Sequence, residues 1–380
     1  MIKHMRGTLL SICFETGLII VLFIFITVPA FAKVSGVCSN CHTMHNSQNG
    51  SAVLRTGTGV GWDISGQLTG GSLQSAPADS LLVTSCLGCH TSTSSQTKMT
   101  IGSSTIPIVY NTIAPTITLA GGNFYWVASD TTKGHNVYGI TGQDGNLNEA
   151  PGRNPAGCAD SCHTTLAAPP TSLNYNRGGC QGCHLFTYHH VDNGVYRFLK
   201  GHGTAPPISL TQARKDITTY TDYVTGVEDS DWEYTKSSVD HNFYHGTTNT
   251  YTSDGAGLTN QKTITAFCAG CHRLFHGPYD SVDGSGMGSG SPWVRHPTDI
   301  ALPQTGEYNA YDPTSNYSTE APVAWENPSS PSRSQAIVMC LSCHRAHGSD
   351  QPDLLRWDYN TIIAGGGGTG GCFVCHTTKN

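Results

Sequence analysis

The chain has 380 residues, enough for two or three ordinary domains, yet its composition is unlike that of an ordinary domain. Only 37% of the residues are hydrophobic and 12% are charged, while 44 are glycine, so little aliphatic material is available for a protein-only core. A net charge of −6, without a run of Lys or Arg, excludes the basic footprint of a nucleic-acid-binding protein. Such a chain either stays disordered or folds around something that the sequence does not show, and its 15 cysteines and 18 histidines favour the second.

The N-terminus has the pattern of a signal peptide. A positively charged start is followed by an apolar stretch over 17–28 and by Ala30-Phe31-Ala32, which has the A-x-A form of a cleavage site. We therefore expect residues 1–32 to be removed on export, which leaves 380 − 32 = 348 residues. An uncleaved membrane anchor is the alternative, because apolar residues begin at Leu9, but Glu15 interrupts that run.

The 14 cysteines after the predicted cleavage site fall into seven pairs, and each pair is followed directly by a histidine. Six pairs have the spacing C-x-x-C-H, and one has an additional residue between its cysteines. In chain order the motifs are Cys38-Cys41-His42, Cys86-Cys89-His90, Cys158-Cys162-His163, Cys180-Cys183-His184, Cys268-Cys271-His272, Cys340-Cys343-His344 and Cys372-Cys375-His376.

This spacing is typical of covalent haem attachment. Two thiols three residues apart can reach the two vinyl groups on one porphyrin edge and form thioethers, and the adjacent histidine becomes the proximal iron ligand. Zinc would not require a histidine after every pair, and neither redox dithiols nor a disulfide framework explains the whole pattern. The sequence therefore predicts a c-type cytochrome with seven haems c, whose burial supplies the missing core. In the irregular motif the additional residue must bulge out, and a disulfide between Cys158 and Cys162 is the main alternative.

Each haem iron needs a second axial ligand. Ten histidines lie outside the motifs and the signal, enough for bis-His ligation throughout, whereas only four methionines remain after the signal. The ten candidates are His45, His135, His189, His190, His202, His241, His245, His276, His296 and His347.

Several of these histidines lie too close to a motif to serve its own haem. His45 and His347 follow motif histidines by three residues, His276 by four, and His189 and His190 by five and six, so none easily reaches the far face of its own porphyrin. We expect each to bind a different haem. His189 and His190 are adjacent, and adjacent side chains of an extended chain point to opposite sides. They could therefore serve two haems, or one of them could be spare.

His45 has only five residues of mature chain before Cys38, so little chain lies upstream to build a neighbouring haem site. Its haem belongs either to another part of the fold or to the next subunit. The second arrangement is a head-to-tail contact, which propagates into a filament unless it closes into a ring.

The expected fold is a multihaem cytochrome c with low regular secondary structure. We expect mostly loops, short helical turns at the motifs and a few short strands, for example within 106–127, wrapped round a chain of haems. The Gly/Ser-rich segments 281–291 and 364–371 predict loops or close backbone approaches to haem, with flexible linkers as the alternative. No domain boundary is evident within 33–380, which is expected to form one multihaem domain.

Longer strings around the motifs resemble a known family. CSNCHTMHN from Cys38, CLSCHRAH from Cys340, AGGNFYW from Ala120, KGHNV from Lys133 and WVRHPT from Trp293 are similar to segments of the extracellular multihaem cytochromes of metal-reducing bacteria that polymerise into conductive filaments (OmcS and OmcE types). The resemblance implies alternately stacked and T-shaped haem pairs, all bis-His, and a trans ligand at the position of His45. Seven motifs depart from the six haems of the OmcS type and the four of the OmcE type.

The predicted function is electron transport without bond chemistry, because bis-His iron is coordinatively saturated. The resemblance places it outside the cell or at its surface, with other c-type cytochromes as partners and acceptors such as metal oxides. A monomeric periplasmic electron carrier is the main alternative. A multihaem reductase enzyme is less favoured, because it needs an open iron position, and neither C-x-x-C-K nor a shortage of distal histidines is present.

Overall fold

The computed structural model describes residues 34, 36–78, 80–147, 150–151, 166–170, 178–184, 187, 189–190, 195–200, 223–248, 262–269, 271–272 and 296–380. The predicted signal peptide, the irregular motif Cys158-Cys162-His163, His202, His276 and the segment 281–291 lie outside the described residues.

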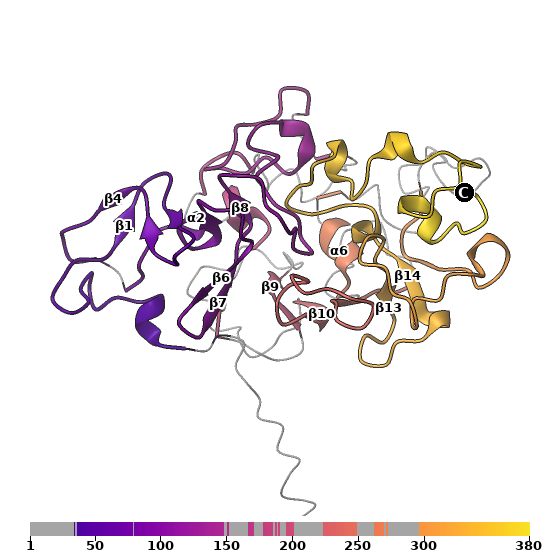
Figure 1. The fold of residues 1–380 in the computed structure, drawn as a ribbon, viewed down its shortest axis with the longest axis horizontal. Helices are drawn as coiled ribbons and strands as arrows, with labels where there is room; N and C mark the ends of the chain where they lie inside the picture. The colour runs from indigo at the N-terminus through magenta and orange to yellow at the C-terminus, as the bar shows by residue number, and fades with distance from the viewer. Residues whose placement is uncertain are drawn as a thin grey trace, which may run out of the picture.

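Regular secondary structure in the described chain is sparse, as predicted (Figure 1). The α-helices are α2 (Cys86–His90) and α6 (Ile264–Ala269). The 3-10 turns are η1 (Cys38–Asn40), η2 (Thr131–Lys133), η3 (Gly179–Gly182), η6 (Gly306–Tyr308), η7 (Arg333–Gln335), η8 (Cys340–Ser342), η9 (Pro352–Leu354), η10 (Tyr359–Thr361) and η11 (Gly371–Val374). The strands are β1 (Arg55–Thr56), β2 (Gly61–Trp62), β3 (Leu68–Thr69), β4 (Ser72–Leu73), β5 (Thr91–Ser92), β6 (Lys98–Ile101), β7 (Ser104–Pro107), β8 (Tyr110–Asn111), β9 (Val195–Lys200), β10 (Tyr223–Val227), β11 (Phe243–His245), β12 (Ile300–Ala301), β13 (Ala324–Trp325) and β14 (Ala336–Val338).

The loops satisfy their backbone groups locally through short polar side chains. The carboxylates of Asp63, Asp130, Asp312 and Asp358 each accept a hydrogen bond from the backbone N–H two residues further on, at 2.9–3.0 Å. These Asx turns offer the backbone an alternative to helix or sheet. They explain how a chain with so little regular structure keeps ordered loops.

The N-terminal region packs around the first two described motifs. Its four-stranded sheet has the order β3-β2-β5-β8, and β6 and β7 form an antiparallel hairpin beside it. Trp62, Met99 and Ile108 are buried in its core, and Cys89 packs against the same cluster. Trp62 Nε1 donates to the Cys89 carbonyl at 2.7 Å, so the core fixes the backbone of the motif.

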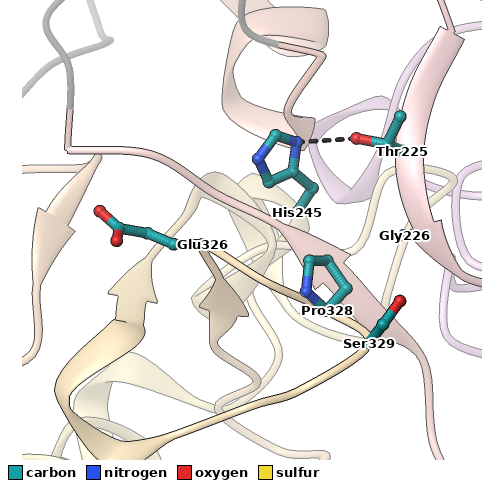
Figure 2. A pocket seen from close by; sticks show the side chains of 6 residues that line it. All are labelled: Thr225, Gly226, His245, Glu326, Pro328 and Ser329. Atoms are coloured by element: carbon teal, nitrogen blue, oxygen red, sulfur yellow. Dashed lines mark hydrogen bonds between the residues drawn. The ribbon is translucent and has the colours of Figure 1, made fainter.

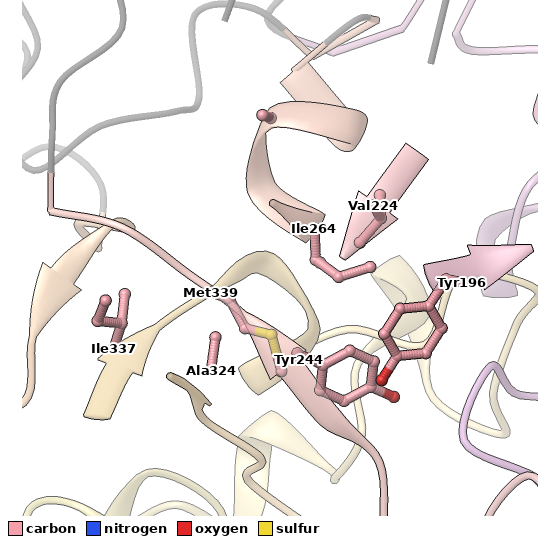
Figure 3. Packing of buried hydrophobic residues seen from close by; sticks show 8 residues of the cluster. Tyr196, Val224, Tyr244, Ile264, Ala324, Ile337 and Met339 are labelled. Atoms are coloured by element: carbon pink, nitrogen blue, oxygen red, sulfur yellow. The ribbon is translucent and has the colours of Figure 1, made fainter. Parts of the chain in front are cut away.

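The C-terminal region contains a mixed six-stranded sheet of order β12-β14-β13-β11-β10-β9. One face carries a cluster in which Tyr196 and Tyr244 stack at 5.4 Å and Ile264 and Met339 pack beside them (Figure 3). Cys268 and its neighbours in α6 pack against this cluster. The protein core therefore lies directly behind a motif.

The two regions lie at opposite ends of the molecule (Figure 1) and are joined by a close backbone contact. Gly122 pairs with Gly348, and the His347 N–H donates to the Gly121 carbonyl at 2.7 Å. Gly122 has φ +91°, and a Cβ there would collide with the Gly348 carbonyl oxygen. Only glycine fits this contact without strain.

Two local predictions of secondary structure can be compared with the described residues. Strands β7 and β8 fall at the start of 106–127 as predicted, while the rest of that stretch in the described chain is loop and turn. The segment 364–371 is a loop up to η11, as predicted. In the part of the chain that the structure describes, no helix has the length and apolar character to cross a membrane.

Candidate haem-attachment sites

We number the attachment sites 1 to 7 by their motifs in chain order, so that site 3 is the irregular motif outside the described residues. In the six described sites the motif forms a helical turn. At sites 1, 4, 5, 6 and 7 the histidine N–H donates to the carbonyl of the first cysteine at 2.8–3.1 Å, and at site 2 the whole motif is helix α2. Residues three apart in such a turn share one face, so both thiols project together. None of the twelve described motif cysteines is paired in a disulfide.

Five motif histidines face a histidine from outside the motifs. The ring centroids are 6.0–6.3 Å apart in every pair. The pairs are His42 with His190 (site 1), His90 with His189 (site 2), His184 with His347 (site 4), His272 with His135 (site 5) and His376 with His296 (site 7).

This spacing fits a metal ion between the rings. A metal–imidazole bond is about 2 Å long and a ring centroid lies about 1.1 Å beyond the binding nitrogen, so two imidazoles on one ion stand about 6.2 Å apart. The observed separations match that sum. The residues present therefore fit iron held by two histidines at these five sites.

Hydrogen bonds to Nδ1 leave Nε2 as the binding nitrogen. The motif histidines donate from Nδ1 to backbone carbonyls at sites 1, 2, 4, 5 and 6, at 2.8–3.2 Å. His135 and His296 do the same, to Ala346 at 2.6 Å and Pro297 at 2.9 Å. Such outer hydrogen bonds fix the tautomer and the ring orientation of metal-binding histidines.

Two of the paired histidines are strongly biased toward the neutral form. Desolvation lowers the pKa of His347 to about 3 and the pKa of His272 to about 4. A neutral imidazole keeps a nitrogen lone pair for a metal. The environment thus favours the ligand form of the ring over its protonated form.

Thiol contacts connect the N-terminal sites in sequence. Burial and the neighbouring charge of Cys41 raise the pKa of Cys89 to about 12, which places site 1 beside site 2. A hydrogen bond from the Cys180 thiol lowers the pKa of Cys86 to about 7, which places site 2 beside site 4. Site 2 therefore lies between sites 1 and 4.

The same contacts continue toward the C-terminus. Burial and the charge of Cys271 raise the pKa of Cys183 to about 12, and the Cys268 thiol donates a hydrogen bond to Cys340, which raises the pKa of Cys268. Burial and the charge of Cys372 raise the pKa of Cys343 to about 12. The described sites therefore follow one another in the order 1, 2, 4, 5, 6, 7.

The structure places three of the histidines expected to bind a different haem opposite the motif histidines of other sites. His189 and His190 face the histidines of sites 2 and 1, although they follow the site 4 motif. His347 follows the site 6 motif and faces His184 of site 4. Each of these residues thus connects one attachment turn to another.

Three other candidates have different surroundings. His45 is exposed and has φ +52°. His241 is buried and lies flat on the Tyr317 ring, with centroids 3.5 Å apart. His245 hydrogen-bonds Thr225 Oγ1 through Nδ1 at 2.7 Å, at the edge of a small pocket (Figure 2). Within the described residues no histidine ring lies opposite His344 of site 6 at the spacing of the five pairs.

Sequence reasoning did not find Glu307. Its carboxylate accepts a hydrogen bond from His376 Nδ1 at 3.2 Å. The two residues are 69 positions apart, and nothing in the local pattern around Glu307 marks it as a partner of a motif histidine. Among the described residues, no three His, Cys, Asp or Glu side chains gather closely enough to hold a bare metal ion.

A family model described as a doubled CXXCH motif matches residues 331–380, which contain sites 6 and 7. The C-x-x-C-H motifs and this match support covalently bound haem c in the chain.

No curated protein matches the chain. Among solved structures, the chain is similar to the Outer Membrane Cytochrome S filament from Geobacter sulfurreducens, with 20% identity, coverage of 88% of this chain and 86% of that chain, and a TM-score of 0.41. It is also similar to the OmcS nanowires from Geobacter sulfurreducens, with 19% identity, coverage of 90% and 88%, and a TM-score of 0.40.

Proposed function

We propose that the protein is an extracellular electron conduit in which seven haems c, each with two axial histidines, pass electrons from one end of the chain to the other. The observation that carries this proposal is the set of five histidine pairs at 6.0–6.3 Å. When bound, each haem would supply one-electron oxidation and reduction of its iron. Two histidines per iron leave no position open for a substrate, which argues against a reductase.

The order of the sites supports conduction along the chain. Each described attachment turn has a cysteine close enough to a cysteine of the next site to shift its pKa, through a hydrogen bond between sites 2 and 4 and between sites 5 and 6 and through charge at the other links. The covalently held porphyrin edges would therefore lie near one another. The chain's own residues set spacing, burial and ligand orientation, which is the protein's share of cofactor chemistry. Sites 1, 2, 4, 5, 6 and 7 are contiguous without site 3, so the irregular motif adds a haem to a path that is already continuous.

Five histidines outside the motifs remain for sites 3 and 6. They are His45, His202, His241, His245 and His276. We propose that His45 acts in trans, on an iron of the next subunit, and thereby joins subunits head to tail into a filament.

Hydrogen bonds of the neighbouring Asn46 fix the backbone of the loop that exposes His45. Asn46 is buried; its side-chain amide donates to the carbonyls of Gln74 and Ala76 at 2.6 and 2.9 Å, and its side-chain oxygen accepts from the N–H groups of Val53 and Leu54. His45 itself is exposed in a left-handed conformation that costs free energy in a non-glycine residue. The anchored neighbour offsets that cost and fixes the direction of the exposed ring.

Exposed apolar side chains occur in both the N-terminal and the C-terminal regions. Val37 is 65% exposed and Met44 is 74% exposed near site 1, and Tyr359 and Ile363 are similarly exposed in the C-terminal region. A second copy of the chain is the occupant that fits both patches, because a head-to-tail contact buries one against the other. Export through the 1–32 signal would deliver the chain outside, where metal oxides and other c-type cytochromes are the expected electron acceptors and partners.

Purification of the native protein from the cell surface tests the proposal. Its intact mass should equal residues 33–380 plus seven haems, its optical spectrum should be fully low-spin, and negative-stain microscopy should show filaments of uniform width. A high-spin band in the wild-type protein would contradict bis-His ligation throughout. Discrete particles at every concentration would contradict the filament and favour a monomeric carrier.

A further inference from the structure

Site 7 differs from the other described sites in the group behind its motif histidine. At sites 1, 2, 4, 5 and 6 the motif histidine donates from Nδ1 to a neutral backbone carbonyl. At site 7, His376 Nδ1 lies 3.2 Å from Oε1 of the Glu307 carboxylate. Site 7 therefore has a motif histidine and a facing histidine like the other paired sites, but a negative charge replaces the neutral carbonyl at Nδ1 of its motif histidine.

The backbone holds this carboxylate in place. Thr377, the residue after the motif, donates to the Glu307 carbonyl from its backbone N–H at 2.8 Å and from its hydroxyl at 2.6 Å. Tyr308 packs against the His376 ring with centroids 5.0 Å apart. Both partners of the hydrogen bond are partly buried, with side-chain exposures of 21% and 23%, so water screens the interaction only in part.

A negative acceptor behind a ligating imidazole changes the iron that the imidazole binds. It draws the Nδ1 proton toward itself and makes the ring a stronger electron donor. A stronger donor favours Fe(III) over Fe(II), and the buried negative charge acts in the same direction. With haem bound at site 7, Glu307 would affect the one-electron reduction of its iron by a neighbouring haem, with no bond formed or broken, while His376 and Glu307 retain the proton between them.

We propose that Glu307 is a positioning residue that lowers the reduction potential of the site 7 haem below that of the sites with carbonyl partners. Each subunit then carries a low-potential site at its C-terminal end, which sets the energy step for electron entry or exit there. This inference rests on the proposed function for the presence of haem at site 7, but it does not require filament assembly.

Lys379 carries the opposite charge to Glu307 and is expected to shift the site 7 reduction potential in the opposite direction. Its Nζ lies 3.3 Å from Glu307 Oε2, on the side of the carboxylate away from the histidine contact, and its side chain is 61% exposed. Lys379 partly compensates the carboxylate charge. Its removal should therefore lower the site 7 potential further, by a smaller amount because the lysine is exposed.

Glu320 provides a matched control. Its carboxylate accepts from the Gly371 N–H at 2.9 Å, directly before Cys372 of the same site, but contacts no histidine. Glu320→Gln removes the same charge from the same attachment turn and leaves the His376 hydrogen bond intact. This variant separates the effect of the His376–Glu307 hydrogen bond on the reduction potential from the effect of any negative charge nearby.

The experiment is a redox titration of the holoprotein, followed by absorbance and by low-spin electron paramagnetic resonance, for wild type, Glu307→Gln, Glu320→Gln and Lys379→Gln. Mass and low-spin spectrum are checked first, and loss of haem or of the low-spin state in the wild type would count against the proposed function instead. In Glu307→Gln we expect one haem to become about tenfold easier to reduce, which is 59 mV for a one-electron couple, with a changed signal for that haem alone.

Lys379→Gln should shift the same haem in the opposite direction, and Glu320→Gln should shift it less than Glu307→Gln. An unchanged titration curve in Glu307→Gln would overturn the inference. Equal shifts in Glu307→Gln and Glu320→Gln would also overturn it, because the effect would then be one of charge alone. If Glu307→Gln does not fold, an unchanged curve in Lys379→Gln decides against the inference, and a downward shift of one haem supports it.

Discussion

The two ends of the molecule differ in what surrounds their motif histidines. At the C-terminal end, site 7 has a facing histidine from an ordered segment of the same region and a carboxylate behind its motif histidine. At the N-terminal end, site 1 takes its facing ring from His190, 148 residues away, and the nearby His45 faces solvent. The comparison indicates that the attachment motif is local in sequence, whereas the facing histidine comes from a distant part of the chain. At the N-terminal end the exposed His45 is the residue that we propose as a ligand for another subunit.

Removal of a facing histidine has the largest expected effect. His190→Ala and His296→Ala should each keep seven haems, because thioether attachment depends only on the motif cysteines, but each should leave one iron without its second ligand. A high-spin optical band corresponding to one haem in seven checks this. A fully low-spin spectrum in either variant would show that the ring pair at that end does not hold an iron.

Removal of His45 sharpens the contrast between the ends. His45→Ala should keep seven haems, weaken filament assembly and expose one iron per subunit. Asn46→Ala should weaken assembly as well, because it removes the side-chain anchor of the loop, at a cost of about 1–3 kcal/mol for the buried groups left unpaired. Filament length by negative-stain microscopy measures both effects, and normal assembly of His45→Ala would rule out the trans ligand.

Acid should destabilise the centre of the molecule. Burial lowers the pKa of His347 to about 3 and the pKa of His272 to about 4, below the value near 6.5 of an unfolded histidine, and an iron held by these rings would favour their neutral form in the same direction. The unfolded state therefore binds more protons between about pH 6.5 and pH 4, so stability is present above pH 6.5 and is lost as the pH falls. Each histidine contributes a slope of up to about 1.4 kcal/mol per pH unit.

Denaturant titrations at pH 7, 6, 5 and 4 measure this slope. Stability that is constant over the range would contradict the burial of neutral rings at sites 4 and 5. A variant with His347→Gln, which removes one of the two groups, should show a shallower slope than the wild type.

Substitution of Gly122 tests the contact between the two regions and has the smallest expected effect. Gly122→Ala forces a Cβ against the Gly348 carbonyl at φ +91° and should destabilise the fold by about 1–3 kcal/mol. Gly57 has nearly the same φ, +93°, with nothing near its Cβ position. Gly57→Ala therefore measures only the cost of placing alanine at this positive φ. Equal losses of thermal stability in Gly57→Ala and Gly122→Ala would mean that the Gly122–Gly348 contact is not tight.

The local part of each site could be predicted from the sequence, and the long-range part could not. The C-x-x-C-H spacing is set within one helical turn, so Cys86, Cys89 and His90 follow from the sequence alone. The partner of His90 is His189, 99 residues further on, and no spacing rule connects them. The short distance in sequence between His347 and the site 6 motif could exclude His347 as a ligand of the site 6 haem. It could not predict which other site His347 faces.

The low content of regular secondary structure could be predicted from the sequence, but the path of each loop could not. Low aliphatic content and many small polar residues predict loops, but the path of each loop depends on long-range side-chain hydrogen bonds such as those of Asn46, which no local pattern gives. Glu307 is a further example, because a carboxylate in a polar loop is unremarkable until the fold places it behind His376.

The most direct test of the account is a cryo-EM structure of the haem-loaded protein. The account predicts an iron between the rings of each of the five pairs, including His42 with His190 at one end and His376 with His296 at the other. An iron at any of these five sites whose second ligand is not the facing histidine would contradict it.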